Sequence, residues 1–378
     1  MGFVGFMIQR FKGLKIHSPG FFLFLAAVVL FIPACATIGP AKPPVERNWP
    51  LPPDPPVISY LNSFSEPKDL GAQRSWFRRT VEFLFGEGPA PHMLRPYAVA
   101  ADGKGRVYVT DTGLQAVHIY DFPAKSYRQI FWVVRGQSRL ISPVGLALDD
   151  EGMIYVSDSQ LNRIFVYEPK KRRLVKILGE PGQFERLTGI AYDPKLGRLY
   201  AVDTSAHRVT VFDQTGKVIM AFGERGAKDG ELNFPTHISV DSESNVYVTD
   251  SMNFRVQIYD SAGRFHGKLG KLGNTLGSFS KPKGVAVDTA GHVYVVDGIY
   301  DTVQIFDREG GLLLNFGQSG EKEGDFWLPA GIAIDKRNQI YVADSYNQRV
   351  QVFRFLGSPK EEEIPAPLPA PAAIQNPR

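Results

Sequence analysis

The stretch Pro282–Phe316, PKGVAVDTAGHVYVVDGIYDTVQIFDREGGLLLNF, decides the fold because it holds four short apolar segments separated by polar turns. The turns carry Gly, Asp and Thr, which suit tight reversals of the chain. Apolar and polar residues alternate only weakly within the segments, as expected for strands that are buried on both faces. We therefore expect a four-stranded antiparallel sheet with strands at 282–288, 292–296, 303–306 and 312–316.

The same unit recurs six times along the chain. An aspartate follows each tyrosine-containing strand, and successive aspartates lie 45 or 47 residues apart. A period in the forties, with several short strands in each unit, is typical of propeller blades. The sequence therefore predicts an all-β, six-bladed β-propeller of four-stranded antiparallel blades, which we number 1 to 6 by these aspartates: Asp111, Asp158, Asp203, Asp250, Asp297 and Asp344.

Three of the connections between units share a glycine-rich pattern with identical spacing. In the first copy the pattern comprises Gly223, Gly226, Gly230, Leu232 and Pro235, and the same spacing returns from Gly270 and from Gly317. Together with P-x-G-[VI]-A-[VI]-D and D-x-x-N-x-R-V-Q, it resembles the NHL repeat over residues 57–355. The resemblance implies a six-bladed propeller, and NHL-type propellers serve widely as interaction platforms.

The two ends of the repeat region predict how the ring closes. Unit 6 ends at Phe355 after its third strand, and Val57–Phe64 (VISYLNSF) resembles the fourth strand of unit 5. We expect this N-terminal strand to complete the last blade, which removes an exposed sheet edge. The face with the second-to-third and fourth-to-first connections is here called the top face. Both tails then leave from the opposite, bottom face.

The N-terminus predicts export. Residues 1–20 carry three positive charges, and the apolar run Phe21–Ile32 is too short for a membrane-spanning helix, so 1–34 is expected to be a signal peptide. Ile32-Pro33-Ala34-Cys35 resembles the lipobox of bacterial lipoproteins, in which the cysteine is lipidated. Ala36 after the cysteine favours, by the same resemblance, the outer membrane. An ordinary signal peptide with an incidental cysteine is the alternative.

Three other segments are expected outside the blades. Residues 35–56 are proline-rich and predict a membrane tether, while 356–378 are rich in proline and alanine and predict a disordered tail. The connection from Ser65 to Pro96 is long and contains a short amphipathic helix at 73–85. This helix suits either packing on the rim or a docking element at the channel mouth.

Composition excludes several classes of function. The net charge of +4 becomes nearly zero after residue 34, with 40 basic and 39 acidic residues, so no general attraction to nucleic acid is expected. A single cysteine excludes an internal disulfide or a multi-cysteine zinc site. No P-loop, CxxCH or HExxH motif is present. We expect a monomeric propeller.

The repeated aspartates are expected to be mainly structural. Arg163, Arg208, Arg255 and Arg349 each follow the aspartate of their unit by five residues, which predicts an ion pair across the turn. Units 1 and 5 have Ala116 and Thr302 instead. Their aspartates could bind a cation or a ligand amine, or cap their own loops through backbone N–H groups.

The loops of the top face supply the candidate binding residues. His207 and His237 come from adjacent units and are weak candidates for a channel metal, Ca²⁺ or Zn²⁺, although two unrelated polar residues give the same pattern. No catalytic residue is identified. Aromatic and amide side chains around a channel mouth suit protein or sugar recognition. The full set of candidates is Asp111, Asn162, His207, His237, Asn253, Asp297, Tyr300, Tyr346 and Asn347.

These features predict a lipid-anchored extracytoplasmic propeller that binds protein or polysaccharide partners in the cell envelope as a scaffold. We expect it to face the periplasm from the outer membrane. The alternative is an envelope enzyme. Some six-bladed propellers, such as peptidylglycine-processing lyases and lactonases, use a channel metal, so a metal-dependent lyase or lactonase is the rival prediction. Fold alone does not separate these functions.

Overall fold

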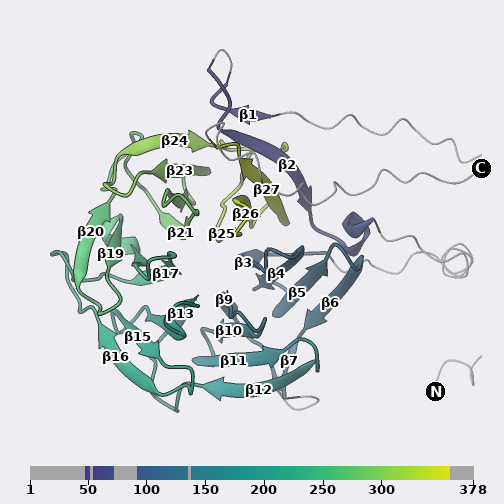
Figure 1. The fold of residues 1–378 in the computed structure, drawn as a ribbon, viewed down its shortest axis with the longest axis vertical. Helices are drawn as coiled ribbons and strands as arrows, with labels where there is room; N and C mark the ends of the chain where they lie inside the picture. Colours follow the sequence, from purple (N-terminus) through teal and green to yellow (C-terminus); the bar gives the residue numbers. More distant parts are fainter. Residues whose placement is uncertain (1–46, 52–53, 72–91, 135–137, 358–378) are drawn as a thin grey trace, which may run out of the picture. The chain divides into compact units, whose positions relative to one another are not determined.

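The computed structural model of the protein describes residues 47–51, 54–71, 92–134 and 138–357. These residues form a ring of six sheets around a central axis (Figure 1). The all-β, six-bladed architecture is therefore confirmed. The predicted signal peptide, Cys35, most of the tether, the 73–85 helix and nearly all of the tail lie outside the described residues.

Blades 1 to 5 are four-stranded antiparallel sheets whose strands follow one another in chain order. Blade 1 is β3(Pro96–Ala101), β4(Arg106–Asp111), β5(Ala116–Asp121) and β6(Ser126–Ile130). Blade 2 is β9(Pro143–Leu148), β10(Ile154–Asp158), β11(Arg163–Glu168) and β12(Arg173–Leu178). Blade 3 is β13(Leu187–Asp193), β14(Arg198–Asp203), β15(Arg208–Phe212) and β16(Val218–Phe222). Blade 4 is β17(Pro235–Val240), β18(Val246–Asp250), β19(Arg255–Tyr259) and β20(Phe265–Leu269). Blade 5 is β21(Pro282–Val287), β22(Val293–Asp297), β23(Thr302–Phe306) and β24(Leu312–Phe316).

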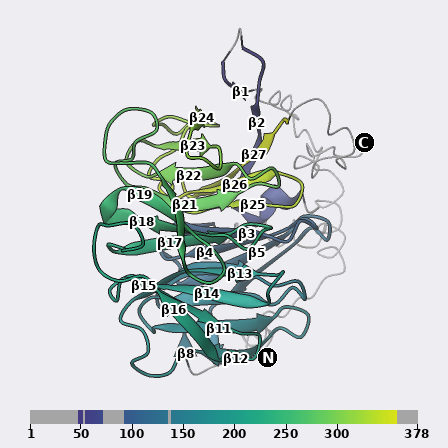
Figure 2. The ribbon, with the colours of Figure 1, turned by 60° about the vertical axis from the view of Figure 1, so that its left-hand side comes forward.

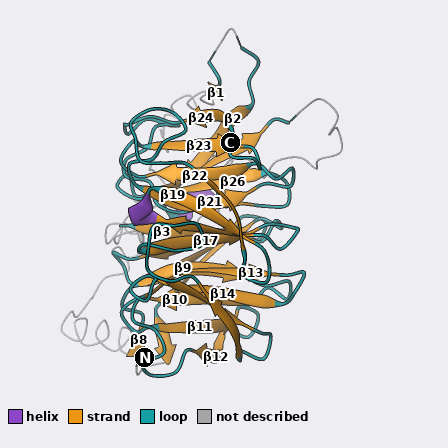
Figure 3. Ribbon diagram, turned by 90° about the vertical axis from the view of Figure 1, so that its left-hand side faces the viewer, coloured by secondary structure: helices purple, strands orange, loops and turns teal. Residues whose placement is uncertain are grey.

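Other elements are short. A hairpin of β7(Trp132–Val134) and β8(Ser138–Arg139) follows blade 1, and the 3₁₀ helices are η1(Pro67–Leu70) and η2(Ser251–Asn253). Figure 3 shows how strands dominate the described part of the chain. Among the described residues, no helix has the length and apolar character needed to cross a bilayer.

Blade 6 closes the ring with strands from both ends of the chain. β25(Ile332–Ile334), β26(Gln339–Asp344) and β27(Arg349–Phe355) come from the C-terminal side, and β2(Ile58–Phe64) pairs antiparallel with β27. Ile58 lies opposite Phe355, so the N-terminal strand enters where the C-terminal strand leaves (Figure 2). The predicted closure is confirmed, because the edge of β27 is hydrogen-bonded to β2.

One strand of this blade was not predicted. β1(Asn48–Trp49) adds a fifth strand outside β2, with Trp49 opposite Ile58. Trp49 is buried and packs against the rings of Phe316 and Phe353, at centroid distances of 5.8 Å each. The indole thus joins the outer edges of blades 5 and 6.

The apolar core lies between blades rather than at the ring centre. One cluster combines Tyr247 and Val256 of blade 4 with Val285 and Val293 of blade 5, and the other clusters likewise join neighbouring blades. Every residue of β22 is buried, whereas the outer strand β24 is largely half-exposed. Burial on both faces explains the weak alternation of the sequence pattern.

The inner strands are irregular at the top face, and this irregularity forms the channel mouth. The register of β3, β13, β17 and β21 with the second strand shifts just after the first residue, so the next two residues leave the ladder. In blade 4 these residues are Thr236 and His237, and in blade 5 they are Lys283 and Gly284. A bulge of this kind re-aims side chains away from the sheet.

Candidate functional site

The aspartate that ends each second strand organises the top connections. Asp297 accepts hydrogen bonds from the backbone N–H groups of Ser280, Lys281, Ile299 and Tyr300. Asp111 accepts four backbone N–H bonds as well, and its Oδ2 lies 3.2 Å from His118 Nε2. Both side chains are fully buried. These two candidate residues therefore already satisfy protein donors, as a loop-capping carboxylate does.

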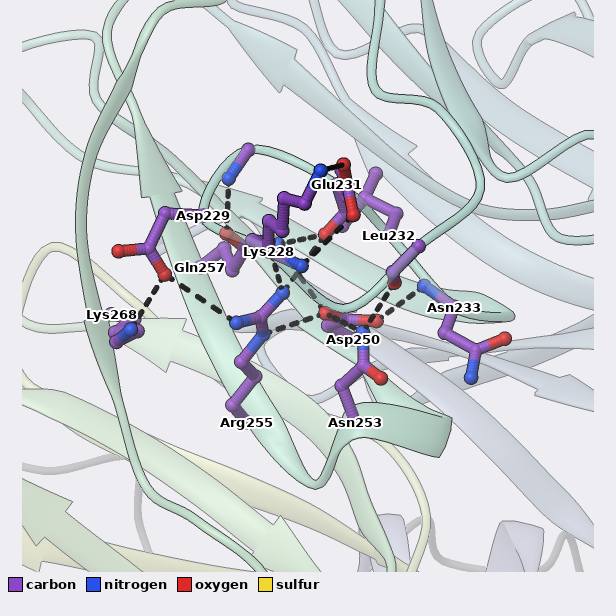
Figure 4. A network of polar contacts seen from close by, with 12 residues as sticks. Lys228, Asp229, Glu231, Leu232, Asn233, Asp250, Asn253, Arg255, Gln257 and Lys268 are labelled. Carbon is purple, nitrogen blue, oxygen red and sulfur yellow. Dashed lines mark hydrogen bonds and ion pairs between the residues drawn. The ribbon is translucent and has the colours of Figure 1, made fainter.

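In blade 4 the same aspartate forms an ion pair. Arg255 Nε lies 2.8 Å from Asp250 Oδ2, and Asn253 Nδ2 donates to the same oxygen at 2.8 Å (Figure 4). The far side of the guanidinium donates to the carbonyls of Lys228 and Glu231. Burial raises the pKa of Asp250, and the Asn233 N–H and the Asn253 and Arg255 side chains oppose the rise. The network fixes the glycine-rich connection to its blade.

The ion pairs follow the prediction in blades 4 and 6 only. Arg349 repeats the geometry of Arg255, at 2.8 Å from Asp344 and with bonds to the carbonyls of Lys322 and Asp325. The prediction was wrong for Arg163, which donates to the carbonyls of Asn162 and Glu180, and for Arg208, which is exposed at the start of β15. Among the described residues, neither forms an ion pair with its aspartate.

The length of the connection before each blade explains why Arg255 and Arg349 form the ion pair and Arg208 does not. In blades 4 and 6 the arginine lies under the long connections 223–234 and 317–328, whose carbonyls accept its second nitrogen. The connection before blade 3, residues 179–186, is shorter and makes no such bond to Arg208 among the described residues. A guanidinium without these acceptors gains less from burial next to a carboxylate.

The candidate asparagine and tyrosine side chains of the top loops also hydrogen-bond to the connections between blades. Asn253 and Asn347 donate to the carbonyls of Gly226 and Gly320, and the hydroxyl of Tyr300 donates to Gly273 in the equivalent place. Asn162 donates to the carbonyl of Glu185 and accepts from the N–H of Leu187. These side chains hold loops in place, which limits the polar atoms they can offer to a ligand.

Large apolar side chains are exposed on the top connections of four consecutive blades. We call this set the apolar crescent; its members are Leu94, Phe234, Met252, Ile299, Trp327 and Tyr346. Trp327 and Tyr346 are 44% and 48% exposed, and their ring centroids lie 5.7 Å apart. The Arg95 guanidinium lies over the Tyr346 ring at 5.7 Å, which joins blade 6 to blade 1. In blades 2 and 3 the positions equivalent to Met252 hold Gln160 and Ser205.

At the top of the channel one residue pair joins opposite blades, and a lysine lies at the bulge of the next blade, near enough for its charge to act on His237. Tyr97 of blade 1 stacks on His237 of blade 4, and Lys283 follows on the neighbouring blade 5. Below them the channel is narrow, and its lining combines polar and apolar atoms: the side chains of Val99, Leu146, Ile190, Ile238, Val285 and Ile332 alternate with the glycine backbone at Gly145, Gly189, Gly284 and Gly331. His237 also lines this space.

The ionisable groups at the mouth have shifted pKa values. Burial, with a smaller contribution from Lys283, lowers the pKa of His237 to about 3, so the imidazole is neutral at pH 7. Burial and the nearby Lys281 lower the pKa of Lys283 to about 8, although Asp301 and Asp297 oppose this shift. Burial raises the pKa of Tyr97. Shifts of this kind often mark functional sites.

The candidate metal pair has other partners. His207 Nδ1 lies 3.3 Å from the Leu232 carbonyl and 3.2 Å from the backbone N–H of Phe234. His237 Nδ1 lies 3.0 Å from Thr236 Oγ1. Within the described part of the chain, no group of three His, Cys, Asp or Glu residues is arranged to hold a metal ion.

Comparison with protein families agrees with these motifs. The profile described as "Teneurin NHL domain" matches residues 134–323, half of the chain, and the "NHL repeat" profile matches residues 326–353. The chain belongs to the NHL family. The D-x-x-N-x-R-V-Q signature of this NHL propeller has a structural role. Its residues in blade 4 hydrogen-bond to one another and to the connection 223–234, and so hold that connection on the blade; they are Asp250, Asn253, Arg255 and Gln257.

The NHL propeller is also similar to individual proteins. It is 34% identical to "Protein brain tumor" of Drosophila melanogaster over 59 residues, which are 16% of this chain and only 6% of that protein. A streptogramin B lyase structure superposes with a TM-score of 0.53 at 13% identity, covering 69% of this chain and 94% of the other. An auxiliary nutrient binding protein from Bacteroides thetaiotaomicron gives 0.55 at 16% identity, covering 69% of each. At these identities the superpositions show the fold alone.

Sequence reasoning missed two members of the channel mouth. Tyr97 and Lys283 occupy the variable position of the P-x-G segment, which elsewhere holds Val144, Thr188, Thr236 and Ala330. A comparison of this position across the six units would have singled out one aromatic and one cation. The stacking of Tyr97 on His237 depends on the ring bringing blades 1 and 4 opposite each other, and no local signal predicts it.

Proposed function

We propose that this NHL propeller is a lipid-anchored binding module of the bacterial cell envelope that holds a protein partner on its top face. The observation that carries the proposal is the apolar crescent. Ten of the eighteen large apolar side chains that are exposed in the described residues lie on top connections, and six of these ten form the crescent. Its centre is the contacting pair Trp327 and Tyr346, and exposed apolar side chains in contact with one another mark interaction sites on soluble proteins.

The composition of the crescent favours a protein over a polysaccharide. Met252, Ile299 and Leu94 are aliphatic, whereas sugar-binding surfaces depend on flat aromatic rings. Aromatic, methionine and arginine side chains together are typical of the centres of protein interfaces. Arg95 and the exposed Lys281 lie on the same face, so a partner segment with apolar and acidic residues is complementary to it.

The two ends of the ring differ in the direction in which the chain leaves the propeller. β2 begins and β27 ends at the bottom face, where Ile58 pairs with Phe355. β1, however, runs antiparallel to β2, and Arg47 before it pairs with Asp325 of a top connection, so the described N-terminal segment leads away from the bottom face. We propose lipidation at Cys35 and outer-membrane attachment facing the periplasm. A Cys35→Ser variant should lose labelling by a fatty-acid analogue and leave the membrane fraction; retention of both contradicts the anchor.

Photo-crosslinking in cells tests the binding function. A photoreactive amino acid is placed at Trp327 or Tyr346 in the full chain, with Ile177 and Leu313 on outer strands as matched exposed controls. We expect one protein adduct at the crescent positions and none at the controls. The identified partner should then bind the purified protein at least about tenfold more weakly after Trp327→Ser. Equal adducts at all four positions, or binding unaffected by Trp327→Ser, would reject the proposal.

The two rival functions make different predictions in the same assays. A polysaccharide-binding protein would give no protein adduct but would retain envelope glycan through Trp327 and Tyr346. A metal-dependent lyase or lactonase requires a ligand set that the described residues do not assemble. We expect chelation to leave the melting temperature of the protein unchanged, and a fall on chelation would favour the enzyme.

A further inference from the structure

We propose that the channel mouth is a binding site for a small organic carboxylate with a short aliphatic tail, held by Lys283 and His237. This inference is independent of the apolar crescent. Its basis is two polar side chains at the bulges of the adjacent blades 4 and 5, near enough for the charge of one to act on the other, and each with unused hydrogen-bonding capacity.

The fold makes room for the lysine in one blade only. The residue after the second-strand aspartate is Ser or Thr in five blades and Gly298 in blade 5. A Cβ atom at position 298 would lie 2.7 Å from Lys283 Cε and 3.1 Å from Nζ. The lysine stem therefore lies against Gly298, in space that a serine at this position would occupy. Gly298 and Lys283 act as a matched pair that sets the position of the ammonium group.

The Lys283 ammonium has no carboxylate partner. Among the described residues, none of the ion pairs within 4.0 Å involves Lys283. Asp297 and Asp301 influence it from a greater distance, but their oxygens accept backbone N–H bonds, from Ser280, for example, and from Leu328. A half-buried cation without a counter-ion is costly, and an anionic ligand would remove that cost.

His237 supplies the second donor. Its Nε2 atom is buried without a hydrogen-bond partner, and the residue is only 9% exposed. The Nδ1 atom contacts Thr236 Oγ1, which lies 2.6 Å from Ser251 Oγ. If Ser251 donates to Thr236 and Thr236 donates to Nδ1, the proton of the neutral imidazole is on Nε2. The ring then offers an N–H donor at the channel mouth.

The charge and the lining decide the class of ligand. Lys283, Lys281 and the Arg186 charge near Tyr97 make the mouth positive, which disfavours a metal cation. Two separate donors suit the two oxygens of a carboxylate. The channel below is narrow, and the Val, Leu and Ile side chains between its four glycines leave apolar surface for a short alkyl tail.

Calorimetric titration of the full chain, purified in detergent, tests the site with isovalerate and its neutral analogue isovaleramide. We expect saturable binding of isovalerate and at least roughly tenfold weaker binding of the amide, a difference of about 1.4 kcal/mol. Lys283→Met keeps an unbranched stem over Gly298 and should weaken isovalerate at least about tenfold without affecting the amide. Lys281→Met, on the exposed neighbouring lysine, is the matched control and should change binding little.

Two further measurements keep the result unambiguous. Lys283→Arg keeps the positive charge but not the compact ammonium group, so it should bind isovalerate more tightly than Lys283→Met and more weakly than the unchanged protein. Nitrogen NMR of His237 should report the Nε2–H tautomer. No saturable isovalerate binding, equal binding of acid and amide, equal loss in Lys281→Met, or tighter binding of inorganic phosphate than of isovalerate would each overturn the proposal.

Discussion

Tyr97 stacks on His237 across the propeller axis, with ring centroids 5.6 Å apart and ring planes inclined by 19°. The two residues come from β3 and β17, the innermost strands of blades 1 and 4, which lie opposite each other in the ring. Both lie where the inner strand leaves its ladder. The bulges aim one ring at the other, and His237 of this pair lines the top of the channel.

Removing the tyrosine should restore the basicity of the histidine. Burial is the main cause of the low pKa of His237, about 3, so Tyr97→Ala should raise the pKa by at least about one unit toward its usual value near 6.5. Proton NMR titration of the imidazole measures this. Tyr346→Ala, on the exposed crescent, should leave it unchanged. A pKa that stays near 3 in folded Tyr97→Ala would show that the blade walls alone desolvate His237.

Trp49 should contribute strongly to stability although it lies in a two-residue strand. It packs against Phe316 and Phe353, and a cation–π contact places Arg47 5.2 Å from its ring. Trp49→Ala should lower the free energy of unfolding by about 3 kcal/mol, as for other buried aromatic truncations. Urea denaturation measures the change, with the exposed Leu51→Ala as control, expected within about 0.5 kcal/mol. Equal effects of the two variants would contradict a closing role for β1.

The arginines of the top face should differ in their effect on stability. Arg255→Met leaves the buried Asp250 carboxylate without its partner and should cost about 3 kcal/mol at neutral pH, whereas exposed Arg208→Met should cost less than about 0.5 kcal/mol. Thermal unfolding compares the two. Similar losses of stability in the two variants would mean that the ion pair between Arg255 and Asp250 contributes little to the stability of the fold.

The cost of Arg255→Met should depend on pH in a defined direction. The pKa of Asp250 is already raised by burial, and loss of the guanidinium raises it further. The native state then binds a proton at a pH where the unfolded chain does not, so the variant loses stability as pH rises through the window above the unfolded pKa. Its deficit relative to wild type should therefore shrink on acidification toward about pH 4. A deficit that grows on acidification would reverse the argument.

Alanine substitution of two glycines should differ in its cost to stability, because the backbone of a neighbouring blade lies close to Gly331 but not to Gly267. A Cβ at Gly331 would lie 2.8 Å from Ala98 Cα and even closer to the Tyr97 carbonyl oxygen, so Gly331→Ala should cost about 2 kcal/mol by forcing blades 6 and 1 apart. At Gly267, in the outer strand β20, a Cβ would lie 3.8 Å from the nearest side-chain atom, Ile258 Cδ1. Gly267→Ala should be neutral or stabilise by about 0.5 kcal/mol. Calorimetric melting distinguishes the two; a harmless Gly331→Ala would contradict the tight inner ring.

The repeat was predictable because each blade is built from local signals. The apolar strand before Asp297 and the turns around it occur again at nearly constant spacing, so the strands of one blade locate the strands of the other five. The closing strand was predictable for a similar reason, since Val57–Phe64 carries the apolar pattern of a fourth strand. Trp49 was not, because a two-residue strand has no periodicity to detect.

The candidate site was less predictable, and the reasons are geometric. Arg208 has the same sequence position as Arg255, yet only Arg255 lies beneath a long connection whose carbonyls accept its second nitrogen. His237 was recognised because it comes from the unit next to that of His207. Its hydrogen-bond state was not, because that depends on Thr236 and Ser251 at the bulge.

By itself, the sequence determined that this chain forms six similar antiparallel sheets and that its first strand completes the last one. The six sheets depend on patterns of burial and turn residues within about fifty positions of one another, and the closure depends on two strands at opposite ends of the repeat region that each carry a recognisable apolar pattern. Only the tertiary structure decided that Tyr97 covers His237 and that Gly298 makes room for Lys283. Such contacts depend on ring closure and on bulged inner strands, which bring side chains from distant blades to within a few ångströms.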